Sequence, residues 1–232
     1  MSTDRSKLPV ILAIFTGGTI SCTLDPERGV PVPTLTGEDI LERTPALHDV
    51  ANVIVDNFGR YPGPHMHPER MLYLADRIRS ATIGGAIDGV VVTHGTDTIE
   101  ETAFVLDRIL APDIPVIILG SMKLVSDPTW DGPANVLAAA QVAASASARG
   151  RGVMVVMADS IHTAAGVTKV HAESYDSFGS PQCGPIGTVD RGNVIFFASP
   201  TRPSLPSFKG DAIEPSVELI KAVAGADGNY VK

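Results

Sequence analysis

The sequence predicts an α/β fold in which a doubly wound, mostly parallel sheet is followed by a C-terminal β-hairpin. Short apolar runs, such as the three valines at 90–92, are typical of parallel strands that are buried on both faces. Segments with apolar residues at helical spacing alternate with these runs, which indicates right-handed crossovers between parallel strands. The chain has 232 residues, 44% of them hydrophobic, and this suffices for a large core.

Each expected strand in the first part of the chain leads into a polar loop. The apolar run 10–15 is the first buried strand, and the segment 52–57 is the second. Between them, the segment 21–33 carries charges, glycine and proline without periodicity, so we expect a mobile loop that acts as a lid. A short helix opens at 36–39 and ends near Arg43.

The middle of the chain repeats the order strand, turn, helix. Pro68 suits the first position of a helix with an apolar stripe that runs to Ile78. The central strand at 90–92 leads into a polar turn, where Asp97 or Thr98 can cap the helix that follows. The remaining expected elements are that helix at 99–110, a strand at 116–119, an alanine-rich helix at 132–144 and a strand at 152–157.

The pattern changes after residue 160. The segment 161–187 has neither a helical nor a strand period. A strand at 193–197 is expected to pair with 186–189 in a hairpin. The segment 199–215 holds four prolines and is interpreted as a linker, with a short helix expected at 217–224.

Composition excludes several classes of protein. The net charge of −8 disfavours unspecific nucleic-acid binding. The chain contains no run of ~20 apolar residues, and residues 1–8 lack the apolar core of a signal peptide, so we expect a cytoplasmic protein without membrane contact. Cys22 and Cys183 do not demand a disulfide. The expected division is a main domain at 1–200 and a proline-containing C-terminal extension at 201–232.

Two turns at the ends of expected strands carry most of the polar groups. They are Thr-Gly-Gly-Thr-Ile at 16–20 and Thr-His-Gly-Thr-Asp-Thr at 93–98. Ligands of open α/β sheets bind at this edge. Backbone N–H groups around Gly18 can point at an oxyanion or substrate, although a structural turn is the alternative. The second turn has more polar groups than capping requires, so we expect a functional site.

Such a site needs a nucleophile, a base that takes its proton, and donors to an oxyanion. Lys169 is a candidate base, because a lysine buried beside a carboxylate and hydroxyls can relay a proton. An exposed surface lysine is the alternative. His65 and His67 stand two residues apart without a clear third ligand, so we expect no metal and no cofactor.

The two turns resemble the two signatures of the bacterial-type L-asparaginase/glutaminase family, over about residues 8–200. Further similar segments occur in the same order at 120–123, 131–133, 155–157, 167–169, 180–181 and 184–185. The resemblance implies that residues 1–200 have the fold of the family's N-terminal catalytic domain. It also implies amide hydrolysis through an acyl-enzyme.

Residue roles follow from the resemblance alone. Thr19 matches the nucleophile and Thr96 the second threonine, which assists attack or activates water. Asp97 matches the carboxylate that binds the substrate's α-amino group, and Lys169 matches the lysine of the proton relay. Backbone N–H groups near Gly95 are expected to hold the oxyanion.

The sequence departs from the family around the substrate. The family's loop tyrosine falls at Val30, and the segment 21–33 has no tyrosine. Tyr61 is a candidate replacement, with an ordinary amphipathic surface role as the alternative.

The family's polar pair that grips the substrate's α-carboxylate and amine falls at Gly63 and Pro64. Neither side chain can donate a hydrogen bond. Such a loss typically costs ~2–5 kcal/mol of binding. Arg60 offers a cation from the same loop.

The family's C-terminal domain, which completes the neighbouring subunit's site, has no counterpart in this sequence. We therefore expect a threonine amidohydrolase that acts on a small carboxamide with specificity changed from asparagine, and a homodimer. A non-catalytic or partner-dependent binding module is the alternative. Thr-Gly-Gly-Thr is neither a P-loop nor a dinucleotide fingerprint, so a nucleotide-binding protein is disfavoured.

Overall fold

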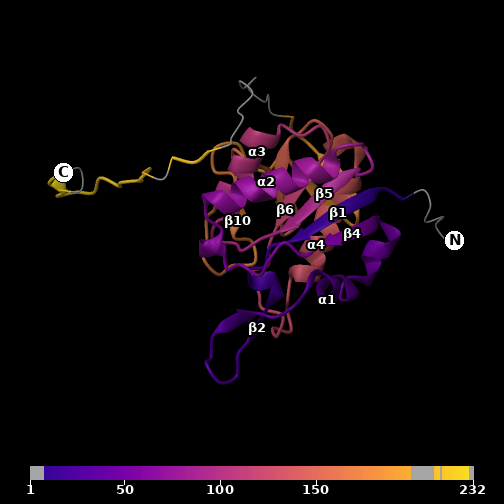
Figure 1. The fold of residues 1–232 in the computed structure, drawn as a ribbon, viewed down its shortest axis with the longest axis horizontal. Helices are drawn as coiled ribbons and strands as arrows, with labels where there is room; N and C mark the ends of the chain where they lie inside the picture. The colour runs from indigo at the N-terminus through magenta and orange to yellow at the C-terminus, as the bar shows by residue number, and fades with distance from the viewer. Residues whose placement is uncertain (1–7, 200–211, 215, 230–232) are drawn as a thin grey trace.

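A computed structural model describes residues 8–199, 212–214 and 216–229 of the chain. The main sheet contains β1 (Val10–Phe15), β4 (Asn52–Asp56), β5 (Gly89–Thr93), β6 (Val116–Leu119), β7 (Val153–Met157), β8 (Ser160–Thr163), β11 (Gly187–Asp190) and β12 (Asn193–Phe196). The helices are α1 (Gly37–Glu42), α2 (Pro68–Thr82), α3 (Ile99–Leu110) and α4 (Gly132–Ala144). In the described ranges, the strand order is β12-β11-β8-β7-β6-β5-β1-β4, as Figure 1 shows in part.

Five neighbouring strands, from β4 to β7, run parallel. Their carboxyl ends therefore meet at one edge of the sheet, where an open α/β fold places its ligands. The strands β8, β11 and β12 continue the sheet in antiparallel pairs. This confirms the α/β class, the mostly parallel sheet and the C-terminal hairpin.

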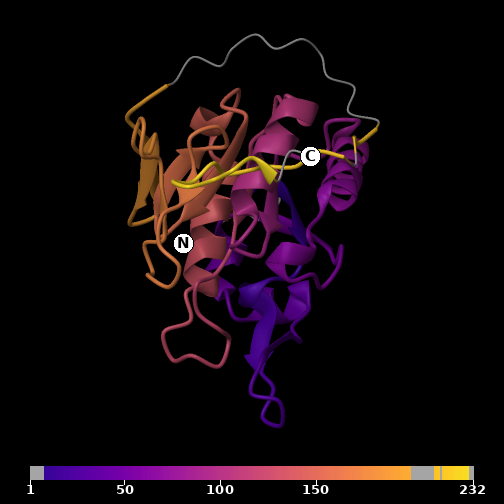
Figure 2. The ribbon, with the colours of Figure 1, turned by 90° about the vertical axis from the view of Figure 1, so that its left-hand side faces the viewer.

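Helices cover both faces of the sheet, as a doubly wound fold requires (Figure 2). Successive side chains of β5 point to opposite faces. Val91 joins a buried cluster with Ile40 of α1 and with residues of α4. Val90 and Val92 join the other cluster, which contains residues of α2 and α3. The unbroken apolar run of β5 thus fills two cores at once.

The expected helix starts are confirmed. Thr36 is the N-cap of α1, and it forms a reciprocal capping box with Asp39, which satisfies backbone donors that the first helical turn leaves free. Pro68 is the first residue of α2, where its missing N–H is harmless.

The structure corrects two sequence interpretations of loops. The segment 21–33 contains a β-hairpin of β2 (Cys22–Leu24) and β3 (Pro31–Pro33), which projects from the body of the molecule in Figures 1 and 2. The segment 161–187 is not without strands. It contains most of β8, and also β9 (Thr168–Lys169) and β10 (Phe178–Gly179). These strands are two to four residues long, too short for a pattern of period two to stand out.

The prediction of a short helix at 217–224 is also wrong, because these residues are not helical. Their apolar side chains, such as Leu219, are exposed, and a helix this short is marginal without tertiary packing. The expected linker at 199–215 lies mostly outside the described residues. Cys22 is buried, Cys183 is exposed, and both are free thiols. No helix in the described ranges combines the length and apolar character that crossing a membrane requires.

Candidate active site

Three turns at the carboxyl edge of the sheet touch through their glycines. A Cβ atom added to Gly18 would lie 2.5 Å from the Cα of Gly95, and one added to Gly95 would lie 2.5 Å from the Cα of Gly63. Real Cβ atoms do not approach backbone this closely, so only glycine fits at Gly18 and Gly95. The turn after β1, the turn after β5 and the loop after β4 are thereby brought into direct contact.

The first turn is also fixed from its other side. Gly17 has a φ of 107°, which favours glycine, and forms an isolated parallel bridge with Tyr61. The Tyr61 N–H donates to the carbonyl of Thr16 over 2.7 Å. Thr19 then begins a single 3₁₀ turn, η2 (Thr19–Ser21), and is partly buried. The expected nucleophile thus follows a backbone segment that is held on both sides.

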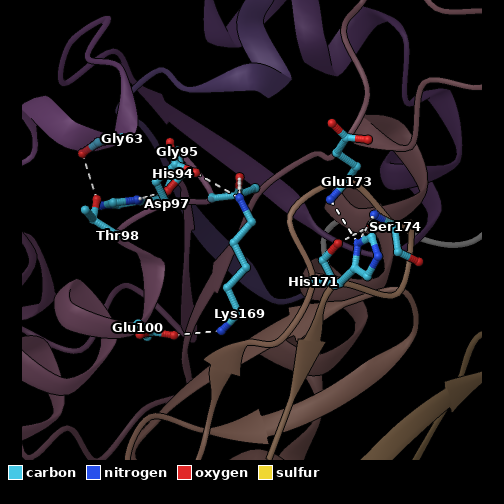
Figure 3. Close-up of polar contacts among 12 residues, drawn as sticks. Gly63, His94, Gly95, Asp97, Thr98, Glu100, Lys169, His171, Glu173 and Ser174 are labelled. Atoms are coloured by element: carbon cyan, nitrogen blue, oxygen red, sulfur yellow. Dashed lines mark hydrogen bonds and ion pairs between the residues drawn. The ribbon is translucent and has the colours of Figure 1, made fainter. Parts of the chain in front are cut away.

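Lys169 joins the second turn from 73 residues away along the chain. Its Nζ donates to Thr96 Oγ1 over 2.9 Å and to Asp97 Oδ1 over 2.8 Å. Figure 3 shows Lys169 reaching Asp97. The Lys169 side chain is 19% exposed and that of Asp97 is 60% exposed. The lysine is therefore not the surface residue that spacing alone would favour.

The backbone of Lys169 is anchored separately. β9 pairs only with β10 in the described sheets, so this two-residue strand stands apart from the main sheet. The Lys169 N–H donates to Glu100 Oε2 in the first turn of α3 over 2.7 Å (Figure 3). Glu100 thus holds the main chain of Lys169 beside the turn that its amine reaches. Sequence reasoning missed this residue.

Neither expected cap of α3 operates. Thr98 is the N-cap residue but makes no side-chain capping bond. Instead, its hydroxyl donates to the carbonyl of Gly63 over 2.7 Å, which ties the second turn to the loop after β4. Asp97 is engaged by Lys169. The side chains serve contacts with other segments, so the prediction that Asp97 or Thr98 caps α3 is wrong.

His94 is an internal brace of the second turn. Its Nδ1 lies 2.8 Å from the carbonyl of Gly95 and its Nε2 lies 2.8 Å from Thr102 Oγ1. Burial lowers the pKa of His94 to about 4, so the ring is neutral at pH 7. Because a carbonyl only accepts, Nδ1 carries the proton and Nε2 accepts from Thr102.

A buried carboxylate organises the neighbouring turn after β6. Asp131 Oδ1 accepts from Ser121 Oγ over 2.7 Å and from the Lys123 N–H over 2.9 Å. Its Oδ2 accepts from the Met122 N–H over 2.9 Å and from Asn135 Nδ2 over 3.0 Å. The segments 120–123 and 131–133, noted in the sequence, therefore meet in one hydrogen-bonded network.

The remaining candidate substrate residues are not gathered at the lysine. The Tyr61 ring packs edge-on against Phe58, with centroids 6.3 Å apart, and lies 4.0 Å beneath the Arg70 guanidinium. Pro64 is exposed. Arg60 lines a cavity beside the first turn, and among the described residues it forms no hydrogen bond or ion pair with Asp97 or Lys169.

The metal interpretation gains no support. His65 and His67 are exposed, and His67 Nδ1 lies 2.7 Å from Glu69 Oε2. In the part of the chain that the structure describes, no group of three or more His, Cys, Asp and Glu side chains is arranged to hold a metal.

This chain is similar to known proteins over most of its length. The family model "Asparaginase, N-terminal" matches residues 10–202. A probable L-asparaginase from Deinococcus radiodurans is 40% identical over 96% of this chain and 67% of its own length. L-asparaginase 2 from Bacillus subtilis is 35% identical over 81% of this chain and 51% of its own.

A solved structure shares the fold. The crystal structure of a probable cytoplasmic L-asparaginase from Campylobacter jejuni superposes with a TM-score of 0.77 and 33% identity, over 83% of this chain and 58% of that chain. The chain thus spans about half to two thirds of the length of the relatives that it matches.

Proposed function

Because this chain belongs to the asparaginase family, we propose that it hydrolyses a small carboxamide through Thr19 and an acyl-enzyme. The observation that carries the proposal is the contact of Lys169 Nζ with Thr96 Oγ1 and Asp97 Oδ1, at 2.9 and 2.8 Å. A hydroxyl, an amine and a carboxylate in one chain of contacts can move a proton. We place this group of three side chains beside Thr19, because Gly18, which precedes Thr19, touches Gly95, which precedes Thr96.

In the first step, Thr19 Oγ1 attacks the amide carbon. Its proton passes to Thr96, whose own proton passes to Lys169 when that side chain is a neutral amine, and Asp97 stabilises the ammonium that forms. The C–N bond then breaks, and ammonia leaves with the transferred proton. Water attacks the ester in the second step and gives a proton to the same relay. The carboxylic acid leaves and Thr19 regains its proton.

Backbone groups stabilise the negative oxygen that forms in both steps. We assign this role to N–H groups near Gly95 and Gly18. Preorganised donors of this kind lower an acyl-transfer barrier by about 3–4 kcal/mol each. The close glycine contacts keep the turns from moving apart as the charge develops.

Substrate specificity differs from that for asparagine in this proposal. Gly63 lies next to Asp97, since a Cβ added to it would stand 3.3 Å from the Asp97 Cβ, yet it has no side chain to bind an α-carboxylate. We therefore propose an amide that lacks a free α-amino acid head. The proposed substrate is a small molecule. We also propose that the protein is cytoplasmic and forms a homodimer.

Ammonia release from a panel of amides tests this. The panel contains asparagine, glutamine, and matched amides without the α-amino and α-carboxylate groups, with Thr19→Ala as the blank. Turnover of a headless amide but not of asparagine supports both parts. Turnover of asparagine alone would refute the altered specificity and support the hydrolytic mechanism. Equal ammonia release from the wild type and Thr19→Ala would refute the assignment of Thr19 as the nucleophile.

One observation favours a second candidate, a partner-dependent subunit. The Asp97 side chain is 60% exposed, although it belongs to the proposed relay, so a second chain can still cover it. Mass measurement by light scattering during size exclusion, with ammonia release measured on each fraction, separates the two. Activity confined to fractions with a second protein favours this candidate, and activity of the chain alone rules it out.

A further inference from the structure

A cavity of about 210 Å³ lies beside the first turn, and Lys169 is not among the residues that line it. Its apolar wall is formed by Phe15, Leu35 and Ile40. Phe15 and Ile40 belong to the core cluster under α1 and α4, whereas Met66 and Ile99, which adjoin Gly63 and Thr98, belong to the other cluster. The apolar wall of the cavity therefore belongs to the core on the α1 and α4 face of the sheet, whereas the residues beside Gly63 and Thr98 belong to the core on the other face.

A backbone wall separates the two sites. Gly17 lines the cavity, and a Cβ added to it would lie 2.5 Å from the Tyr61 nitrogen. The Tyr61 N–H also donates to the carbonyl of Thr16. None of Thr19, Thr96 and Lys169 lines the cavity, so a ligand there does not meet the reacting groups.

Thr93 carries an unpaired hydroxyl at the wall of this cavity. The residue is 1% exposed, lines the cavity, and its Oγ1 has no hydrogen-bond partner among the described residues. It is the last residue of β5 and pairs with Phe15 in register, so it points to the same face as Phe15. A buried hydroxyl without a partner is unfavourable, and a ligand acceptor or donor would satisfy it.

The other polar side chains of the cavity already have partners. Ser21 Oγ donates to the Gly18 carbonyl and Thr36 Oγ1 donates to Asp39. Asn57 accepts from the Gly37 N–H and donates to Glu38. The Thr93 hydroxyl and the Arg60 guanidinium remain to bind a ligand.

Arg60 is exposed and lines the cavity. Hydrogen bonds from the backbone and side chain of Thr36 lower the pKa of Asp39, and the charges of Arg43 and Arg60 lower it further. The guanidinium is therefore close to α1, where it can also meet a ligand carboxylate. Asp39 already accepts two bonds from Thr36 and does not need this cation for pairing.

We propose that this cavity binds a short hydroxy- or keto-carboxylate. Arg60 takes the carboxylate, Thr93 bonds the second oxygen, and the apolar wall packs against the carbon chain. The volume of about 210 Å³ far exceeds the ~10–15 Å³ that one water molecule needs, so the cavity has room for a chain of about four or five carbon atoms. Gly17 and Ser21 flank Thr19, so the ligand lies against the backbone that carries the nucleophile. The site does not depend on the hydrolytic function.

Calorimetric titration of the full chain with 4-oxopentanoate and with pentanoate tests the proposal. The keto acid is expected to bind in the millimolar range or tighter. Pentanoate is expected to bind about tenfold more weakly, because it leaves the Thr93 hydroxyl unpaired. Thr93→Val keeps the shape and should remove this preference, while Arg60→Gln should weaken both ligands. Thr19→Ala should change neither.

Several results would overturn the proposal. They are equal binding of the two acids, a preference that persists in Thr93→Val, loss of binding in Thr19→Ala, or no binding of either acid in the millimolar range. Arg60 is exposed, so its variant folds even if the core variant does not. Thermal unfolding of Thr93→Val should show unchanged or higher stability, because the substitution removes an unpaired hydroxyl.

Discussion

The backbone N–H of Lys169 donates over 2.7 Å to Glu100, while the amine of the same lysine reaches Thr96 and Asp97. The main chain of Lys169 is thus held by α3, and its amine is held by the turn after β5. The position of the amine depends on this anchor, because β9 is not part of the main sheet.

Replacing Glu100 by alanine is expected to lower kcat about 10- to 100-fold with little change in KM, because small misplacements of a catalytic group have effects of this size. Glu100→Gln keeps an acceptor for the Lys169 N–H and should retain most activity. Steady-state kinetics on the best amide of the panel measures both. Glu101→Gln is the matched control on the same helical turn. Equal loss in the two Glu100 variants would point to charge instead of positioning.

Thr19→Ala should lower kcat by about 10³-fold or more, because removal of a nucleophile eliminates the acyl-enzyme route. Thr19 is partly buried at the end of a glycine turn, so its thermal unfolding temperature should stay within about 2 °C of the wild type. Thr19→Ser should keep measurable turnover. An acyl-enzyme trapped at another residue would refute the assignment.

Lys169→Met should lose activity with little loss of stability. The Asp97 carboxylate is 60% exposed, so water replaces its lost partner, and an ion pair this open contributes below about 1 kcal/mol. Urea unfolding and ammonia release on the same sample measure the two effects. Activity within threefold of the wild type would exclude Lys169 from the relay.

His94 should make the free energy of unfolding depend on pH in the acid range. Its pKa of about 4 in the folded protein lies below the usual 6.5, so the unfolded chain binds a proton first as pH falls. Stability is therefore full above pH 6.5 and falls toward pH 4, by about 3 kcal/mol in total. Urea midpoints between pH 7 and pH 4 measure the slope.

His94→Asn should flatten that slope, whatever its effect on stability at pH 7. His162 contributes in the same direction, because burial lowers its pKa as well, so the variant should leave part of the slope. An unchanged slope in His94→Asn would contradict the neutral, buried state of His94.

Gly63→Ser should raise turnover of asparagine relative to the headless amide, because it places a hydroxyl beside Asp97. The added Cβ meets Asp97 Cβ at 3.3 Å, a contact that small shifts can relieve. Gly95→Ala is the contrasting variant, since its Cβ would meet Gly63 backbone at 2.5 Å. It should lower activity on every amide. Unchanged substrate ratios in Gly63→Ser would show that another group reads the α-carboxylate.

Sequence analysis identified the parts of this fold that depend on local pattern. The buried run at 90–92, the opening of a short helix at 36–39 and the first helical position of Pro68 each depend on residues that are close together in the sequence. The turn at 93–98 was recognisable because its polar groups exceed what a cap needs. Lys169 was a candidate base from its residue type, but its spacing favoured a surface lysine, and only the resemblance matched it to the proton relay.

Contacts between distant segments were beyond such reasoning. Glu100 resembles any acidic residue in a first helical turn, and only the fold brings β9 to it. β8 was missed because four residues, Ser-Ile-His-Thr, give no periodicity. The hydroxyl of Thr98 looked like a cap, yet the loop after β4 supplies a competing acceptor at Gly63.

The contact between the three glycines has a consequence for folding. Gly18, Gly63 and Gly95 come from segments that meet only after β4, β1 and β5 have paired, and the Thr16 hydroxyl bonds Thr93 across 77 residues. Such non-local pairings close late, because the chain entropy of long loops is lost before the contacts form. Partly folded chains therefore lack the assembled turns, and hydrolytic competence arises together with the completed sheet.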